Sequence, residues 1–237
     1  MTRPDNPIAV ALDTADLHRL EQLAADLGPR VGVLKVGLQA FSAHGPAALR
    51  AAAAHGPVFA DVKLHDIPNT VTGAAAALAG HGVDYFTVHA SGGPAMVAAA
   101  VKAAPQVCVL AVTVLTSMDD KTLAAVGQDD VTAQVARLAT LAVEAGAGGI
   151  VCAPHEATAV RKAVGPAPVI VTPGVRPASV AAGDQARVAT PVAARAAGAD
   201  ILVIGRPITG ADDPSAALDA IRTELNDAST NNQGPTL

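Results

Sequence analysis

The chain has 237 residues, of which 51% are hydrophobic and 16% charged, so it is a globular protein with a sizeable core and not a largely disordered one. Its net charge of −5 and its 2% of aromatic residues argue against nucleic-acid binding, which needs cationic side chains and stacking platforms. No apolar run approaches the roughly 20 residues that span a membrane, and the N-terminus shows no signal-peptide pattern. Cys108 and Cys152 lie inside apolar runs, as expected of reduced thiols. We therefore expect a cytoplasmic protein that binds neither nucleic acid nor membranes.

Short runs of β-branched residues alternate along the chain with alanine-rich segments of helical periodicity. Continuous apolar strands that alternate with helices are typical of a parallel sheet covered on both faces. About eight such units in a chain of this length predict an α/β protein with a closed (β/α)8 TIM barrel. A doubly wound open sheet is the alternative, but the first run ends in LDTAD, without the glycine-rich turn of that fold. The expected strands cover residues 8–13, 31–37, 58–63, 85–90, 107–115, 149–153, 168–172 and 201–205, and the clearest helical segments cover 17–27, 94–103 and 131–145.

No linker divides the chain, so we expect one barrel domain over residues 1–225. The residues from Asn226 to the end are polar and show no period. This composition predicts a flexible C-terminal tail over residues 226–237.

Charged residues stand at the carboxyl ends of the expected strands, where the active sites of TIM barrels form. Asp13 ends the first strand, and Lys35 lies in the second. Asp61 and Lys63 lie two residues apart in the third strand, so both project from one face, and Asp66 follows just beyond. A helix cap, a lysine reaching the rim or a structural ion pair are the alternatives. Lys35, Asp61, Lys63 and Asp66 form an alternating Lys–Asp–Lys–Asp set, which needs no metal and offers a fixed ammonium group to a reacting carbon.

A second constellation follows the last two strands, where TIM barrels commonly bind phosphate. Gly205 allows a backbone N–H to approach a ligand closely, and Arg206 offers a bidentate fork to a phosphate dianion. The segment 176–185 is rich in alanine, serine and glycine and is interpreted as a mobile lid over that phosphate. An ordinary surface loop is the alternative.

The segment FADVKLHDIPNTV resembles the signature of the orotidine 5′-phosphate decarboxylase family, with D-x-K-x-x-D-I-P-N-T intact at 61–70. The resemblance spans nearly the whole chain and is closest to the compact bacterial branch. The other matching motifs are VALD at 10–13, LKVG at 34–37, TVHASGG at 87–93, VTVLTSM at 112–118, TPGVRP at 172–177, AGDQ at 182–185 and VIGRPIT at 203–209.

This resemblance implies roles for the charged residues. Lys63 would be the proton donor and the cation beside C6 of the pyrimidine, with Asp61 next to the substrate carboxylate. Lys35 and Asp66 would complete the array, and Asp66 would reach in from the second subunit of a homodimer. Asp13 and Lys35 would hold the ribose hydroxyl groups.

The resemblance also implies the remaining contacts of the substrate. Ile67 and Thr70 would come from the partner subunit together with Asp66, and Thr116 would lie near the base. The phosphate and its lid would be held by Arg176, Gln185, Gly205 and Arg206.

The expected reaction is decarboxylation of orotidine 5′-monophosphate (OMP) to UMP and CO2, without a cofactor or a metal. The electron pair left at C6 lies in the ring plane, so its stabilisation has to be electrostatic. One alternative is a metal-dependent phosphosugar decarboxylase or aldolase of the same superfamily, which needs an acidic metal ligand on the second strand, where this chain has Lys35. The other alternative is a non-catalytic nucleotide-binding barrel.

Overall fold

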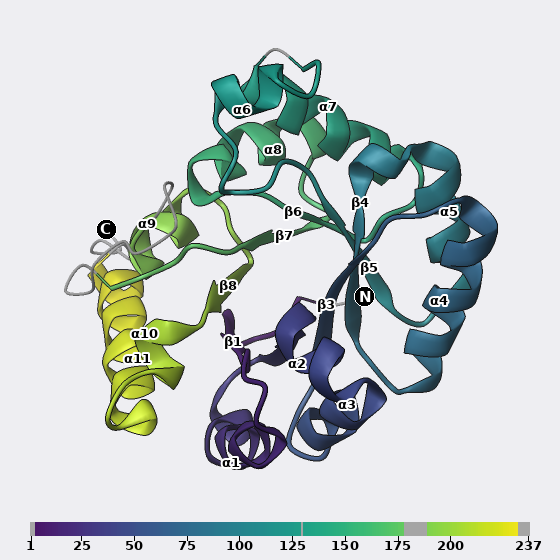
Figure 1. The fold of residues 1–237 in the computed structure, drawn as a ribbon. Helices are drawn as coiled ribbons and strands as arrows, with labels where there is room; N and C mark the ends of the chain where they lie inside the picture. Colours follow the sequence, from purple (N-terminus) through teal and green to yellow (C-terminus); the bar gives the residue numbers. More distant parts are fainter. Residues whose placement is uncertain (1–2, 129, 178–188, 232–237) are drawn as a thin grey trace.

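A computed structural model describes residues 3–128, 130–177 and 189–231. Eight strands form a closed barrel in which each strand pairs in parallel with its chain neighbours and β8 closes against β1 (Figure 1). This confirms the predicted (β/α)8 barrel and excludes the open sheet, which would leave two unpaired edges. The strands are β1 (Ile8–Ala11), β2 (Val33–Gly37), β3 (Val58–Leu64), β4 (Tyr85–His89), β5 (Cys108–Val112), β6 (Gly149–Val151), β7 (Val169–Thr172) and β8 (Ile201–Ile204).

The helices surround the barrel and cover its outer face (Figure 1). They are α1 (Leu17–Leu27), α2 (Leu38–His44), α3 (Pro46–Ala53), α4 (Pro68–Gly80), α5 (Pro94–Ala103), α6 (Asp120–Ala124), α7 (Val131–Glu144), α8 (Ala157–Val164), α9 (Pro191–Ala196), α10 (Arg206–Thr209) and α11 (Pro214–Asn231), with short 3₁₀ helices at Gly28–Arg30, Ala90–Gly92 and Pro154–Glu156. Asp16 and Asp130 cap α1 and α7 by accepting hydrogen bonds from backbone N–H groups of the first turns. Among the described residues, no helix is long and apolar enough to cross a membrane.

The strands are buried on both faces, which is why they read as continuous apolar runs. Alternate residues, such as Ala9, Val33 and Phe59, fill the barrel interior. The residues between them, such as Val10 and Leu34, pack against the surrounding helices in a second, larger cluster. The charged side chains discussed below occupy the same inward positions, but at the carboxyl end of the barrel.

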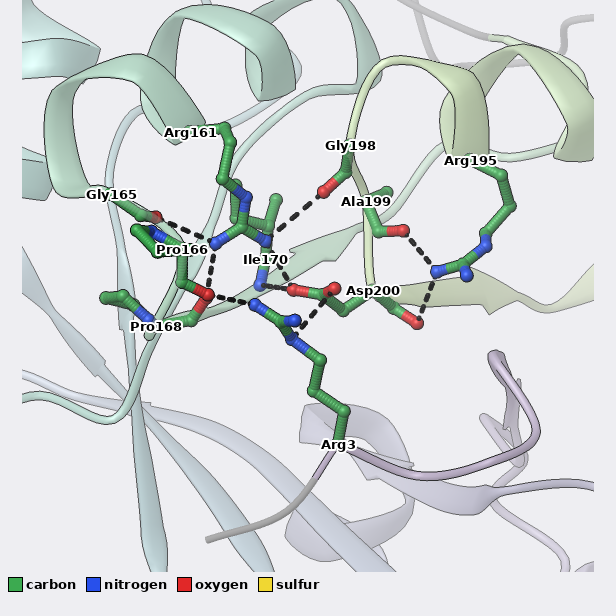
Figure 2. A network of polar contacts seen from close by, with 10 residues as sticks. All are labelled: Arg3, Arg161, Gly165, Pro166, Pro168, Ile170, Arg195, Gly198, Ala199 and Asp200. Carbon is green, nitrogen blue, oxygen red and sulfur yellow. Dashed lines mark hydrogen bonds and ion pairs between the residues drawn. The ribbon is translucent and has the colours of Figure 1, made fainter.

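A polar network ties together the opposite, amino end of β7 and β8 (Figure 2). The carboxylate of Asp200, directly before β8, accepts hydrogen bonds from Arg161 Nη2 at 2.6 Å and from the Ile170 backbone N–H at 2.8 Å. Arg3 brings the N-terminal segment to the same carboxylate, with Nε 3.0 Å from Oδ1. Arg161 also donates to the carbonyl oxygen of Pro168 at 2.7 Å. This network lies at the far end of the barrel from the charged strand ends.

Helix α11 continues to Asn231, six residues beyond the expected end of the domain at residue 225. Residues 226–231 of the predicted tail thus continue this helix, and the flexibility of the tail stays a prediction. Leu218 and Ile221, earlier in α11, are buried in the larger core cluster, so one face of this helix packs onto the rest of the domain. Residues 232–237 lie outside the described part of the chain.

Candidate active site

A linear cluster of four charged side chains lies at the carboxyl ends of β1, β2 and β3. Lys35 Nζ lies 3.4 Å from Asp13 Oδ2 and 3.2 Å from Asp61 Oδ2. Asp61 also contacts Lys63, whose Nζ lies 2.7 Å from Oδ1. Positive and negative groups thus alternate along the cluster, but its fourth member is Asp13 and not Asp66, which the sequence had placed in the set.

The electrostatics of this cluster favour its ionised form. Burial alone would raise the pKa of Asp61, but the adjacent ammonium groups of Lys35 and Lys63 outweigh it and lower that pKa below its ordinary value. The carboxylate therefore stays charged at neutral pH. Lys35 is only 5% exposed, and the two carboxylates that flank it compensate its buried charge.

The cluster forms one wall of a cavity of about 500 Å³ at the mouth of the barrel. The opposite wall is apolar and comes from β5 to β8 and the residues that follow β5. It includes Val112, Val114, Val151, Val171 and Val203. Thr116 lines the cavity beside these residues, where the resemblance places the base of the substrate. A planar ring could lie against the apolar wall while its charged substituent faces the lysines.

A cationic end of the cavity follows β7 and β8. Gly205 follows β8, Arg206 begins α10, and Arg176 follows β7; all three line the cavity. Backbone hydrogen bonds join the two ends of the segment between β7 and α9, since Arg176 N donates to Ala189 O at 3.0 Å and Ala189 N to Gly174 O at 3.3 Å. The two guanidinium groups make this end suited to an anion.

Three of the predicted site residues that the structure describes do not line this cavity. Asp66, Ile67 and Thr70 are exposed, at the end of β3 and the start of α4, and the Asp66 carboxylate accepts a hydrogen bond from the Ile67 N–H at 2.7 Å. Among the described residues, Asp66 forms no ion pair with Lys63 of its own chain. Strand position alone predicted that Asp66 joins the charged cluster of its own chain. That prediction is wrong, because the chain turns into α4 after β3 and carries Asp66 outward. Gln185 lies outside the described residues, as does the expected lid beyond Pro177.

Thr87 is a site residue that the strand-end charges did not reveal. It lies in β4, is fully buried, and its hydroxyl donates to Asp61 Oδ1 at 3.0 Å. The available signal was a threonine at an inward position of the apolar strand YFTVH.

His89 lies two residues after Thr87, at the end of β4, and its ring packs against that of His65, with centroids 5.4 Å apart. Burial, together with the charges of His65 and Lys63, lowers the pKa of His89, so it is neutral at pH 7.

Metal-ligating groups do not gather around this cavity. Over residues 3–128, 130–177 and 189–231, no group of three or more histidine, cysteine, aspartate or glutamate side chains is placed to hold a metal ion. In the charged cluster, the position between Asp13 and Asp61 is occupied by the Lys35 ammonium group.

The chain is similar in sequence and in structure to members of one protein family. The profile of the orotidine 5′-phosphate decarboxylase / HUMPS family matches residues 6–221. The chain is 59% identical over 226 residues to the orotidine 5′-phosphate decarboxylase of Anaeromyxobacter sp. (strain K), covering 94% of this chain and 100% of that protein. It is 56% identical over 222 residues to that of Thermobifida fusca, covering 92% and 95%. The crystal structure of the Lactobacillus acidophilus enzyme of the same name is similar with a TM-score of 0.82 at 36% identity, covering 94% of this chain and 100% of that chain.

Proposed function

Because the chain belongs to the orotidine 5′-phosphate decarboxylase / HUMPS family, we propose that it removes CO2 from OMP to form UMP, the last step of de novo pyrimidine biosynthesis. The observation that carries this proposal is the position of Asp61, which lies within 3.2 Å of both Lys35 Nζ and Lys63 Nζ at the wall of the cavity. The cytoplasm, where this pathway generally runs in bacteria, is the proposed location.

The geometry suits a reaction that leaves an electron pair in the plane of a ring. The C6–carboxyl bond of OMP breaks, its electron pair stays on C6, and CO2 leaves. The Lys63 ammonium group then gives its proton to C6. A preorganised cation stabilises charge most where water is excluded and no reorganisation is needed. Asp61 holds Lys63 in place and lies next to the departing carboxylate in this proposal.

The substrate would span the cavity from the charged cluster to the cationic end. The ribose hydroxyl groups would meet Asp13 and Lys35, and the base would lie near Thr116. The phosphate would bind to Arg176, Gly205 and Arg206. The phosphate is remote from C6, so its binding energy can order the site before the bond breaks.

The position of Lys35 argues against the metal-dependent relatives considered from the sequence. Those enzymes need an acidic ligand on the second strand to bind Mg²⁺. Here the second strand presents an ammonium group that is already paired with two carboxylates. That arrangement repels a divalent cation.

A single ultraviolet assay tests the function. Purified protein with OMP should show loss of the orotate absorbance, and EDTA should not change the rate. Lys63→Ala should abolish turnover while the protein stays folded, whereas Lys102→Ala, an exposed lysine on α5, should behave as wild type. Loss of activity in EDTA would favour the metal-dependent enzyme. Binding of UMP without any turnover of OMP by the wild type would favour the nucleotide-binding barrel.

We further propose a homodimer in which Asp66, Ile67 and Thr70 complete the partner subunit's cavity. Two observations support it: these residues lie outside the cavity of their own chain, and the Ile67 side chain is 66% exposed, which is unusual for an isoleucine. Mixing inactive Lys63→Ala with inactive Asp66→Asn protein tests this by complementation. A mixed dimer would contain one intact site, so activity should return on mixing. Sedimentation as a monomer, or no return of activity in verified mixed dimers, would contradict the proposal.

A further inference from the structure

Strand β3 departs from regular pairing with β4 beside the charged cluster. Ala60 pairs with Phe86, but the next pair joins Leu64 to Val88. Asp61, Val62 and Lys63 therefore all lie opposite a single residue of β4, Thr87. This is a β-bulge, which re-aims side chains and leaves backbone groups without their ladder partners.

The hydroxyl group of Thr87 closes this bulge from the neighbouring strand. It accepts a hydrogen bond from the Lys63 backbone N–H at 2.9 Å and donates one to Asp61 Oδ1 at 3.0 Å. Thr87 is 0% exposed, so water does not compete for these bonds. One hydroxyl group thus contacts both the backbone of the proposed proton donor and the carboxylate that pairs with it.

The backbone of Lys63 needs such support. Its φ of 51° is the only positive value at a non-glycine residue in the described parts of the chain. The left-handed region is unfavourable for a residue with a Cβ atom and persists only where the surroundings enforce it. At Lys63 this conformation accompanies a Nζ to Asp61 Oδ1 distance of 2.7 Å.

We propose that Thr87 is a positioning residue for the decarboxylation, because its hydroxyl group holds the β3 bulge in the conformation that aims Lys63 and Asp61 at the same point. This inference rests on the proposed function and adds a residue that need not touch the substrate. Thr87 acts on the geometry of the reacting groups and not on the affinity for the nucleotide. Its removal should therefore lower kcat much more than it raises KM.

Substitution of Thr87 by valine or by serine distinguishes the effect of its hydroxyl group from the effect of its side-chain shape. Thr87→Val keeps the volume and removes both hydrogen bonds, while Thr87→Ser keeps the hydroxyl group. Thr113→Val is the matched control, because Thr113 is also buried near the barrel mouth and its hydroxyl donates to Val151 O at 3.0 Å, away from the charged cluster. All variants are compared with the wild type by circular dichroism, thermal unfolding and OMP kinetics.

A displacement of about 1 Å in a reacting group can cost about 100-fold in rate, so we expect a loss of this order in kcat for Thr87→Val, with KM changed by less than about three-fold. Thr87→Ser and Thr113→Val should stay within about five-fold of the wild-type kcat. A wild-type kcat in Thr87→Val, or an equal loss in Thr113→Val, would overturn the inference. If Thr87→Val does not fold, Thr87→Ser remains the test, and a loss in its kcat as large as about 100-fold would overturn the inference as well.

A crystal structure of the Thr87→Val protein gives a reading that does not depend on activity. We expect Lys63 to leave the left-handed region or its Nζ to move away from Asp61. Unchanged geometry at Lys63 would contradict the inference even if activity fell. A wild-type protein without OMP turnover would instead refute the proposed function, so the two failures are distinguishable.

Discussion

The Asp13 carboxylate occupies the space into which any side chain at Gly37 would project. A Cβ atom at position 37 would lie 2.2 Å from Asp13 Oδ1 and 2.5 Å from Oδ2. The φ of Gly37 is −92°, which any residue can adopt, so glycine is needed here for the close approach and not for its backbone freedom. The absence of a side chain at Gly37 lets the Asp13 carboxylate approach β2, with Oδ2 3.4 Å from Lys35 Nζ.

Gly37→Ala should therefore displace Asp13 and weaken the binding of OMP. We expect KM to rise about 10-fold, the equivalent of roughly one hydrogen bond to a ribose hydroxyl group, with a smaller effect on kcat. Steady-state kinetics with OMP measures both. Gly80→Ala in α4 is the control, because a Cβ atom there meets nothing within 4 Å. It should leave KM unchanged and stabilise the protein by about 0.5–1 kcal/mol through helix propensity. An unchanged KM in Gly37→Ala would show that Asp13 does not bind the substrate in this position.

Arg206→Ala should weaken binding of the phosphate by roughly 1.5–3 kcal/mol, the contribution of one charged hydrogen bond. The loss should appear for OMP but not for orotidine, which lacks the phosphate. Comparing kcat/KM for both substrates in wild type and variant isolates the interaction. An equal loss for both substrates would place the effect of Arg206 elsewhere.

Tyr85, the single tyrosine of the chain, provides an optical test of the barrel interior. Burial, with the charges of Cys108 and Asp84, raises its pKa to about 12. Its ring packs edge-to-face on Phe59, with centroids 6.3 Å apart. The tyrosinate absorbance should thus reach half its maximum near pH 12 in the folded protein and near pH 10 in denaturant.

The same pKa difference predicts how stability depends on alkaline pH. The pKa of Tyr85 is higher in the folded state than in the unfolded state, so the contribution of the neutral side chain is complete below pH 10 and is lost as the pH rises toward 12. Denaturant unfolding of wild type and Tyr85→Phe measures this, and the two should diverge only above pH 10. A native titration near pH 10 would show that the ring is accessible to water.

Asp200→Ala should lower the free energy of unfolding by about 2–4 kcal/mol, because it leaves Arg161 and the Ile170 N–H without their shared acceptor (Figure 2). The matched control is Asp219→Ala, which removes an exposed partner of Arg30 and should cost less than about 1 kcal/mol. Urea unfolding measures both. Activity of the folded Asp200→Ala protein should be near that of wild type, since the network lies at the far end of the barrel; a large loss of kcat at full folding would contradict this separation.

The barrel and most of its site could be predicted from the chain alone. Strands buried on both faces give continuous apolar runs, so each charge among them, such as Lys35 or Asp61, stood out and pointed to a functional position. Local order along one strand was enough to expect Asp61 and Lys63 in one cavity. The place of Arg206 directly after the last strand predicted an anion site, and the structure brings Arg206 to the same cavity.

The features of the site that the sequence did not predict depend on how neighbouring strands pair. The bulge opposite Thr87 and the approach of Asp13 to Gly37 depend on the register of neighbouring strands, which no pattern within a single strand encodes. The position of Asp66 also depends on tertiary structure. The turn into α4 sets the direction of its side chain, and its distance from Lys63 along the chain does not. Periodicity along the chain therefore determined which residues face the cavity, while contacts between distant segments determined how precisely they are held there.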